Sequence, residues 1–590
     1  MKTTKLLVGA LSLLTFAACS DDKDTGIIVP DGEQFAKIRV DIVSNAVSGR
    51  ADETFVDGTA AENNITSARI VFYDANGNPM TTSSVTAADA TKDSEGGNVE
   101  LVKTFEAKVT LPDGRYPSYM MVFVNPISGS EISSLPIANL KTQVRNSYQR
   151  GTDFAMNNAV YFNTDGSIQR EVAVSQENFY QTDEEAASAP TVRVYIERLA
   201  AKVRLTSTDG DAADLGNQTG TLENEDGQTS HVLKFTATGW GLNATARNCY
   251  LSKVFLTEAG NPWNYSDMNS SFGFDWNDPT RHRSYWAFTP HYYMPETNMT
   301  NGDYKFPFVS DQVNDAVNRL DYISYNDLEK AAPIDGSLYT FENTVASALY
   351  NDQTINTNAA LVSAVVTGYY TVDNEIKDFY IHGKNIYLKQ DYLIAMSNYS
   401  NVIVKEDGTV LDDPSVLEDI FEIYHPTTPI GTDATKGVEE NKVTIRFKNT
   451  AANRQNYKYK SGSNDPVEIT AALVPTINED LQAHCGLASA YTGGKAYFNV
   501  PIRHLAKAPT GTNTAWAPGA FGVVRNHYYQ VNVSGFAELD YDKLGHGVLD
   551  PNKPVVPPGD PNDDFGIKAD IRVLAWRVVN NNVILGDKIK

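Results

Sequence analysis

Two segments near opposite ends of the chain alternate apolar and polar residues with a period of two. The first is Phe35–Val43 and the second is Gly566–Leu585. This period is typical of a β-strand with one buried face. On the buried face we expect Ala36, Ile38, Val40 and Ile42 in the first segment, and Ile567, Ala569, Ile571 and Val573 in the second.

The two strands also correspond residue by residue. Ala36–Val43 reads AKIRVDIV and Ile567–Leu574 reads IKADIRVL, so both have a Lys at the first outward position and carry Arg and Asp in swapped order. Two strands with this match could occupy the same position in a sheet. Amphipathic strands in general share some of this likeness, so the correspondence alone is weak.

A proline-rich linker, Asp550–Asp564, precedes the terminal strand and contains five prolines. Such linkers are extended, at roughly 3 Å per residue, and would hold the strand off the preceding domain. An isolated amphipathic strand needs a sheet edge or groove elsewhere to pair with. The alternative is that it folds back as an edge strand of its own domain.

The rest of the chain is mainly β-patterned. Ala68–Asp74 runs into Asn76-Gly77, which predicts a hairpin, and Thr191–Thr206 is strongly periodic. The polar stretch Asp209–Gly220 that follows predicts a domain boundary. Further strands are expected at Val99–Leu111, Tyr119–Asn125, His231–Gly239, Ala359–Val366, Lys442–Lys448, Lys495–Ile502 and Val523–Phe536. Helical spacing is present at Pro136–Arg150 and weakly at Asp311–Ala331, whereas Asp391–Asn398 fits a helix or a strand.

The N-terminus has the features of a secretion signal. Lys2 and Lys5 precede the apolar run Leu6–Ala18, which is shorter than the ~20 residues of a membrane-spanning helix. Phe16-Ala17-Ala18-Cys19 resembles a bacterial lipobox, whose cysteine is lipidated, and Ser20-Asp21-Asp22 resembles an acidic surface-export tag.

The composition excludes some functions. A formal net charge of −24 and a pI near 4.8 argue against nucleic-acid binding and favour an exterior protein. Beyond Cys19 only Cys249 and Cys485 remain, which could form one bridge or be buried thiols.

No motif predicts catalysis or a cofactor. The nine histidines show no metal-binding spacing, and we interpret His484-Cys485 as structural and not nucleophilic. Gly239–Ala244 matches a loose dinucleotide pattern without its βαβ context, so we expect a β-turn. Asp74–Asn78 resembles the start of a calcium loop without the closing glutamate, and a hairpin turn explains it. Aromatic loops at Trp263–Tyr293 could bind carbohydrate, but such residues more often fill β-sandwich cores.

A candidate proteolytic site lies after the first strand. Ser44–Gly58 is mostly small and polar, and within it Arg50 is followed by Ala51. An arginine in such a segment is accessible to a trypsin-like protease, although any exposed arginine in a loop fits this description.

Taken in order, these features resemble the Bacteroidetes fimbrillins, the pilins of type V fimbriae, and most closely the stalk subunit of the minor fimbriae. The resemblance spans the chain and is carried by loose motifs in a specific order: the lipobox, Gly49-Arg50-Ala51, VYIERLAAKVRL (Val194–Leu205), YTFENT (Tyr339–Thr344), GKAYFNVPI (Gly494–Ile502), VVRNHYYQVNV (Val523–Val533) and DIRVLAWRVVNNNVIL after the linker.

The resemblance implies an all-β fold with minor helices, built as two transthyretin-like β-sandwich domains plus an extended C-terminal donor strand. The expected parts are a signal peptide with lipidated Cys19 (1–19), a propeptide with the first strand (20–50), an N-terminal domain (51–208), a C-terminal domain (209–549) and a linker with the donor strand (550–590). It also implies a precursor anchored in the outer membrane by lipid and a mature protein in a surface fimbrium.

The resemblance further implies maturation and polymerisation. An arginine-specific protease would cleave Arg50–Ala51, so that Ala36, Ile38, Val40 and Ile42 leave the first domain. The next subunit would fill the vacated groove with Ile567, Ala569, Ile571, Val573, Leu574, Trp576 and Val578.

The expected partners are identical subunits, anchor and tip subunits, the protease and surface receptors, in adhesion and biofilm formation. No enzymatic activity, cofactor or metal is expected. The alternative function is a monomeric surface glycan-binding lipoprotein, and the receptor and the state of Cys249 and Cys485 stay open.

Overall fold

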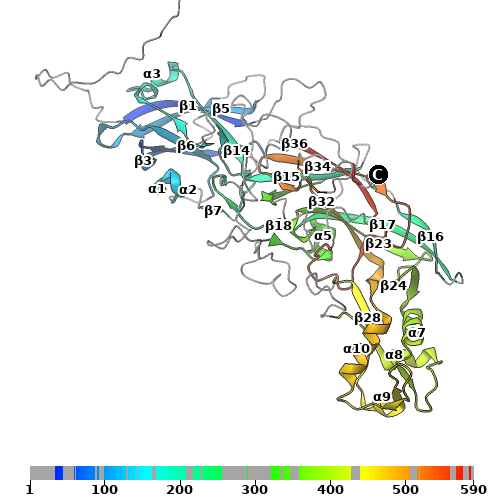
Figure 1. Cartoon of the computed structure of the whole chain (residues 1–590). Helices are drawn as coiled ribbons and strands as arrows, with labels where there is room; N and C mark the ends of the chain where they lie inside the picture. The colour runs from blue at the N-terminus through cyan, green and yellow to red at the C-terminus, as the bar shows by residue number, and fades with distance from the viewer. Residues whose placement is uncertain are drawn as a thin grey trace, which may run out of the picture.

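A computed structural model gives the fold of the chain (Figure 1). It describes residues 33–43, 59, 61–86, 90–91, 99–127, 131–140, 143–145, 147–162, 168–207, 215, 217–225, 227, 229–255, 287, 289, 320–332, 336–345, 358–426, 439–504, 515–516, 519–558, 566–575 and 584–585. Within these ranges strands dominate and helices are short, which confirms the prediction of an all-β fold with minor helices.

The N-terminal region forms one nine-stranded sheet. Its order is β3-β2-β6-β10-β14-β1-β5-β4, with β13 also paired to β6. The strands are β1 (Glu33–Val43), β2 (Ser67–Tyr73), β3 (Pro79–Thr86), β4 (Ala90–Thr91), β5 (Val99–Thr110), β6 (Tyr119–Val124), β10 (Met156–Asn158), β13 (Val172–Ala173) and β14 (Val192–Arg198). The predicted hairpin is confirmed, because Asp74 accepts hydrogen bonds from the backbone of Asn76 and Asn78, both 2.8 Å, between β2 and β3.

The second region is a sandwich of two five-stranded sheets. One has the order β21-β15-β34-β36-β37 and the other β16-β17-β23-β32-β35. The first contains β15 (Ala200–Ser207), β21 (Ser337–Phe341), β34 (His527–Phe536), β36 (Ile567–Ala575) and β37 (Ile584–Leu585). The second contains β16 (Thr219–Glu223), β17 (Ser230–Asn243), β23 (Ser363–Val372), β32 (Lys495–Pro501) and β35 (His546–Gly547).

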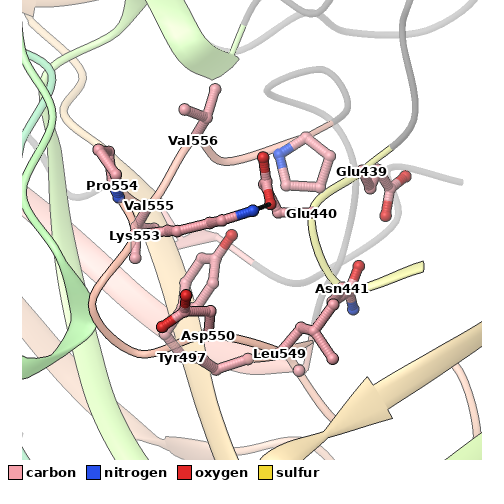
Figure 2. A pocket seen from close by; sticks show the side chains of 13 residues that line it. Glu439, Glu440, Asn441, Tyr497, Leu549, Asp550, Lys553, Pro554, Val555 and Val556 are labelled. Atoms are coloured by element: carbon pink, nitrogen blue, oxygen red, sulfur yellow. Dashed lines mark hydrogen bonds and ion pairs between the residues drawn. The ribbon is translucent and has the colours of Figure 1, made fainter. Parts of the chain in front are cut away.

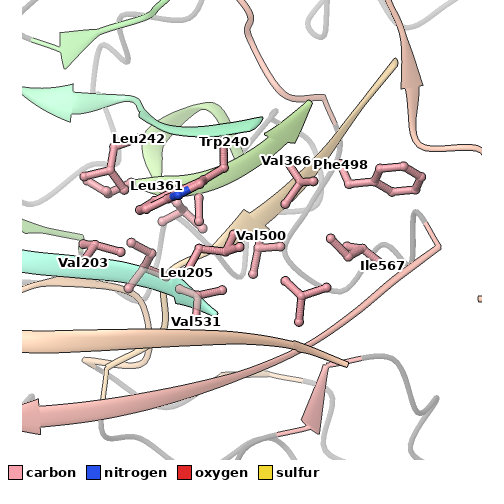
Figure 3. Packing of buried hydrophobic residues seen from close by; sticks show 14 of the residues in the cluster. Val203, Leu205, Trp240, Leu242, Leu361, Val366, Phe498, Val500, Val531 and Ile567 are labelled. Atoms are coloured by element: carbon pink, nitrogen blue, oxygen red, sulfur yellow. The ribbon is translucent and has the colours of Figure 1, made fainter. Parts of the chain in front are cut away.

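Side chains from both sheets meet in one apolar core. Val203 and Val531 come from the first sheet, and Trp240, Val366 and Phe498 come from the second (Figure 3). The alternation of apolar residues along these strands therefore buries one face of each sheet against the other.

The single periodic stretch Thr191–Thr206 is divided between the two regions. Its first part is β14, in the N-terminal sheet, and its second part is β15, which pairs with β21 and β34. Only Leu199 separates them. The sheets therefore divide at Leu199, before the boundary that we expected after residue 208, because the periodicity of a strand carries no mark of the sheet it joins.

Gly239 and Gly241 lie inside β17, so the expected β-turn at Gly239–Ala244 is wrong. A Cβ on Gly239 would lie 2.4 Å from the carbonyl oxygen of Glu329, in helix α5 (Tyr325–Ala331). The glycines therefore allow α5 to pack directly on the strand, a close approach that a larger residue would prevent. Helix α5 lies in the second half of Asp311–Ala331; residues 311–319 lie outside the described ranges.

Residues 379–426 and 439–491 form a further part, the distal module, which extends from the sandwich at one end of the molecule (Figure 1). Its sheets have the orders β25-β24-β31-β28-β27 and β26-β29-β30. The strands are β24 (Phe379–His382), β25 (Asn385–Leu388), β26 (Ile403–Lys405), β27 (Phe421–Tyr424), β28 (Lys442–Phe447), β29 (Tyr457–Tyr459), β30 (Val467–Glu468) and β31 (Ala488–Tyr491). The helices are α7 (Lys389–Ser400), α8 (Leu417–Ile420), α9 (Ala451–Asn456) and α10 (Val474–Cys485).

The distal module settles two expectations about helices. Asp391–Asn398 lies in α7 and is a helix. Helix α10 was not predicted, although its buried residues Val474, Ile477, Leu481 and Cys485 follow helical spacing.

Short elements complete the described fold. Pro136–Arg150 is not one helix: α2 (Ile137–Leu140) is followed by the strands β7 (Val144–Arg145) and β8 (Gln149–Arg150). The remaining pairs are β8 with β9 (Asp153–Phe154), β11 (Tyr161–Phe162) with β12 (Ile168–Gln169), β18 (Thr245–Ala246) with β20 (Leu320–Asp321), β7 with β19 (Cys249–Tyr250), and β22 (Asn343–Thr344) with β33 (Gly522–Val523). Helices α1 (Glu131–Ser134) and α3 (Asp183–Ser188) lie in the N-terminal region.

Candidate functional site

Strand β1 is an inner strand of the N-terminal sheet. It runs parallel to β14, with Ile38 opposite Val192 and Ile42 opposite Ile196. On its other side it runs antiparallel to β5, with Ala36 opposite Ala107. The segment that precedes the candidate cleavage site therefore pairs with two strands at once, and its loss would leave both β14 and β5 without a partner along that side.

Two of the four residues predicted for the buried face are described with their side chains. Ala36 is 2% exposed and Ile38 is fully buried, in a cluster that includes Phe105 and Ala107. For the other two, the backbone positions are described: Val40 lies opposite Val194 and Lys103. Ile42 lies opposite Ile196.

Two polar side chains of β1 contact neighbouring elements. The Lys37 ammonium donates to the carbonyl oxygen of Ala187 in α3 at 2.9 Å. Glu33 pairs with Lys108 at 2.7 Å, but both side chains are more than half exposed, so this pair adds little to stability. Most of the attachment of β1 therefore comes from its two hydrogen-bonded ladders and its buried apolar residues.

The first described residues after the candidate cleavage site are held at the junction of the two regions. The Glu62 side chain is 1% exposed and lies 2.7 Å from the ammonium of Lys202 in β15. The Thr59 backbone N–H and the Tyr339 hydroxyl also donate to Glu62. Burial alone would raise the pKa of Glu62, but the hydrogen bonds and the Lys202 charge hold it below its ordinary value.

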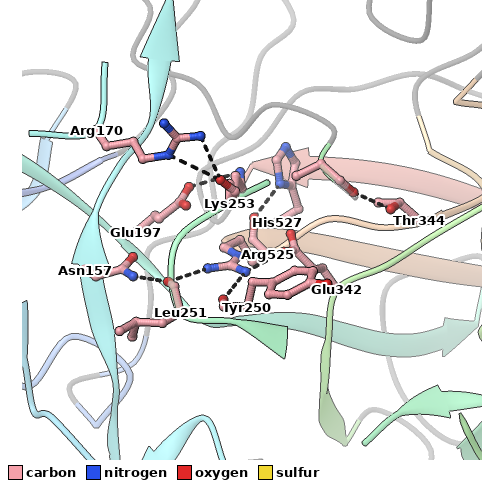
Figure 4. Close-up of polar contacts among 11 residues, drawn as sticks. Asn157, Arg170, Glu197, Tyr250, Leu251, Lys253, Glu342, Thr344, Arg525 and His527 are labelled. Carbon is pink, nitrogen blue, oxygen red and sulfur yellow. Dashed lines mark hydrogen bonds and ion pairs between the residues drawn. The ribbon is translucent and has the colours of Figure 1, made fainter. Parts of the chain in front are cut away.

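A buried cluster of charges joins the two regions (Figure 4). Glu197, the last residue but one of β14, lies beside the Lys253 ammonium at 3.2 Å. Arg525 precedes β34 and pairs with Glu342, and all four side chains are buried. Arg525 also donates to the carbonyl oxygens of Tyr250 at 2.7 Å and Leu251 at 3.2 Å.

Burial and neighbouring charges shift the pKa values of these groups in different directions. It raises the pKa of Glu197 and lowers that of Lys253, because it disfavours the charged form of each group. For Arg525, burial alone would lower the pKa, but the Glu342 charge keeps the pKa above its ordinary value. The Arg525 guanidinium therefore stays charged inside the protein.

The C-terminal strand β36 does not stand away from the body in this structure. It runs antiparallel to β34, from Phe536 opposite Ile567 to His527 opposite Ala575, and β37 pairs on its other side. This is the alternative in which the tail folds back onto its own domain.

The linker before β36 is also attached to the sandwich, contrary to the expectation that it would hold the strand off. Val555 donates to the Ile323 carbonyl oxygen at 2.9 Å and accepts from Asn243 at 2.7 Å, while Asn358 donates to Pro558 at 2.9 Å. Lys553 points toward Glu440, 3.3 Å away, across a small pocket that Tyr497 also lines (Figure 2). Proline-rich composition indicates extension, but it does not exclude hydrogen bonds from side-chain amides to the linker carbonyl groups.

The predicted terminal-strand residues differ in how far they can be placed. Ile567 is 7% exposed and belongs to the sandwich core, near Phe498 in Figure 3. For Ala569, Ile571, Val573 and Leu574 the strand and its register are described. Trp576 and Val578 lie outside the described residues, as do Cys19, Arg50, Ala51 and nearly all of Trp263–Tyr293.

Of the chemistry-bearing residues considered in the sequence, the structure describes both cysteines beyond Cys19. Cys485 ends helix α10, and burial raises the pKa of its thiol to about 12. Cys249 and Cys485 are both buried, and no disulfide joins them. In the described ranges no group of three His, Cys, Asp or Glu residues could hold a metal ion. Among the helices of those ranges, none has the length and apolar character needed to cross a membrane.

Comparison with protein families gives a match in the C-terminal part. Residues 489–582, which include β32, β34 and β36, match the model of the family described as major fimbrial subunit protein type IV, fimbrillin, C-terminal. This match confirms the fimbrillin resemblance. No curated protein sequence matches the chain.

Solved structures give weaker similarities. A candidate cell adhesion protein from Parabacteroides distasonis is 11% identical, with a TM-score of 0.35 over 92% of this chain and 100% of that chain. A fimbrilin from Porphyromonas gingivalis is 10% identical, with a TM-score of 0.31 over 93% and 98%. The tip fimbrial protein of the same species, truncated at its C-terminus, is 10% identical, with a TM-score of 0.27 over 84% and 94%. These values are too low to support an inference about function.

The buried charge cluster predicts an asymmetry between two glutamates. Glu342→Gln leaves the Arg525 charge buried without its counter-ion, so the free energy of unfolding should fall by about 3–5 kcal/mol. Glu422→Gln is the matched control, because its pair with Arg446 is about 40% exposed, and it should change stability by no more than ~1 kcal/mol. Urea unfolding of both variants measures this difference, and equal effects would contradict the assigned role of the cluster.

Proposed function

We propose that this chain is a structural stalk subunit of a cell-surface fimbria, which is cleaved after Arg50 and polymerises by donor-strand exchange. The fimbrillin match over residues 489–582 supports a fimbrial subunit. Cleavage and strand exchange are supported by the position of β1 in the sheet and by the two amphipathic strands near the chain ends.

The observation that carries the proposal is the place of β1 between β14 and β5. Cleavage at Arg50–Ala51 cuts the covalent link between β1 and the rest of the domain, because β1 ends at Val43. The detached strand is then held only by non-covalent contacts. Strand exchange requires an inner strand that can be separated from its domain. When such a strand leaves, it opens a slot with unpaired backbone N–H and C=O groups on both sides.

The energies involved favour a kinetically controlled exchange. Burying a side chain such as Ile38 contributes about 1.5–3 kcal/mol, and each ladder hydrogen bond contributes a net ~0.5–1.5 kcal/mol. Ordering each residue of the incoming strand costs about 1–2 kcal/mol of backbone entropy. Outgoing and incoming strands make similar contacts, so the net gain is modest, and the persistence of a fibre rests on slow dissociation.

The C-terminal strand is the donor in this proposal. In the subunit described here it is paired with β34, so polymerisation requires that it detach from its own sheet before or while it enters the next subunit. An occupied β1 slot and a docked tail would together keep the precursor monomeric.

The ends of the chain fit export before assembly. Lipidation at Cys19 would hold the precursor in the outer membrane, and cleavage after Arg50 would release the body from that lipid. Other subunits would then anchor and cap the fibre. The chemistry of maturation belongs to the arginine-specific protease, so the chain needs no catalytic residue of its own. Adhesion and biofilm formation would follow from the fibre, through surface receptors.

Arg50→Ala tests the cleavage step. The variant should remain at the cell surface as an acylated, monomeric precursor, because β1 stays covalently attached and its slot stays filled. Mass spectrometry of the surface protein should find lipidated Cys19 in the variant and Ala51 as the N-terminus of the unmodified chain.

Arg247→Ala is the control, because Arg247 is exposed and pairs with Asp321 far from the cleavage segment in the sequence. It should mature and form fibres normally. Fibres of normal length from Arg50→Ala would contradict the proposal, and lipidated Cys19 on the mature unmodified chain would favour a monomeric glycan-binding lipoprotein instead.

A further inference from the structure

The entry into β36 is fixed to the sandwich by tight packing. The Gly566 carbonyl oxygen accepts from the Ala537 backbone N–H at 2.6 Å, and a Cβ on Gly566 would lie 2.0 Å from the Lys543 carbonyl oxygen. The next residue, Ile567, is buried in the same core as Phe498. The chain is therefore held at two successive residues where the strand begins.

A bulge separates this fixed entry from the rest of the strand. The register of the β34–β36 ladder shifts between Val533 and Gly535. Ile567 and Lys568 pair on one side of the shift, and Ala569–Ala575 pair on the other. A register shift interrupts the regular ladder, so it gives a natural point at which the longer part could detach while the entry stays in place.

The sequence of the longer part of β36 matches that of β1 in a register that does not include Ile567. When the two sequences are aligned, four of five residues are identical between Ala569–Val573 (ADIRV) and Ala36–Val40 (AKIRV). The alternative register, which places Ile567 at the position of Ala36, gives no identity at the buried positions and requires Ile567 to leave its own core.

The shape of the β1 slot favours the same register. Ala36 faces Ala107, and both are buried, so this position has room for a small side chain only. Ile38 fills the next buried position, opposite Phe105. An isoleucine at the first position would be overpacked and an alanine at the second would leave a cavity, whereas Ala569 and Ile571 reproduce the residues that β1 places there.

At one polar position, the residue of β36 carries the opposite charge to the residue of β1 that it would replace. Asp570 would replace Lys37, opposite Glu106, whose pKa is already raised by burial and by Asp183. Lys37 is only partly buried, and a charge at such a position contributes less than the fit of two fully buried side chains.

From these contacts we propose that Ile567 is an anchor that stays in its own subunit, and that the donor is Ala569–Val573, in register with Ala36–Val40 of the next subunit. This inference rests on the proposed strand exchange and specifies which residues enter the slot. It differs from the expected donor set in leaving Ile567 out. Ala569 becomes the residue that sets the register, because it meets the small site beside Ala107.

Two reversible disulfide staples test the anchor in the full-length chain, matured by the protease. Phe536→Cys with Ile567→Cys ties the entry to β34, and Asn532→Cys with Asp570→Cys ties the longer part; each is a directly opposed pair. Fibre growth is measured by light scattering and electron microscopy with each staple oxidised and then reduced. Subunits with the entry staple should form fibres at the same rate in both states. Subunits with the second staple should form fibres only when the disulfide is reduced.

The outcomes separate the inference from the proposed function. If the oxidised entry staple also stops growth, Ile567 must leave and the anchor is wrong, although strand exchange stands. If subunits with the oxidised entry staple and subunits with the oxidised second staple both form fibres normally, β36 is not the donor and the proposed function itself is wrong. The reduced form of each variant is its own reference for any loss of folding from the substitutions.

A single substitution tests the register. Ala569→Ile should slow growth by about tenfold or more, because the larger side chain is forced beside Ala107. In the alternative register the same isoleucine would enter the Ile38 position and growth would be kept or improved. Ala107→Gly in the accepting subunit should restore growth of Ala569→Ile, while normal growth of Ala569→Ile with unmodified subunits would overturn the register.

Discussion

The pairing of β1 with β14 and β5 is the interaction on which the rest of this account depends. An inner strand satisfies the backbone groups of both neighbours, and buried backbone groups without partners are costly. The slot therefore cannot stay empty for long in water. A strand that leaves must be replaced, and only another alternating strand with small and large side chains in the right order fits the buried positions at Ala36 and Ile38.

The junction between the two regions keeps the slot and the tail on one body. Strands β14 and β15 are joined through Leu199 alone, and the charges of Glu197, Lys253, Glu342 and Arg525 are buried where the regions meet. Glu62 holds the chain there just after the cleavage segment. Because breaking a buried ion pair is costly, the two regions are expected to move as one unit when β1 leaves.

Structural features that depend on neighbouring residues could be predicted from the sequence. Features that depend on contacts between residues far apart in the chain could not. The alternation in β1 and β36 and the Asn76-Gly77 hairpin could be predicted, because strand period and turn chemistry are local properties. The division at Leu199 and the return of the linker through Asn243 and Asn358 could not, because they depend on which distant strand or amide is nearby. The packing of Ile567 in the sandwich core could not be predicted for the same reason, because its alternation fits either sheet.

The most direct test of the central claim is a disulfide between neighbouring subunits in a fibre. Subunits carrying Glu106→Cys are mixed with subunits carrying either Asp570→Cys or Lys568→Cys, cleaved by the protease, polymerised and oxidised. Because Glu106 lies opposite Lys37 of β1, mass spectrometry should find residue 570 of one subunit linked to residue 106 of the next, and only after cleavage. Long fibres in which neither 570 nor 568 links to 106 would contradict the claim that the tail of one subunit replaces β1 of another.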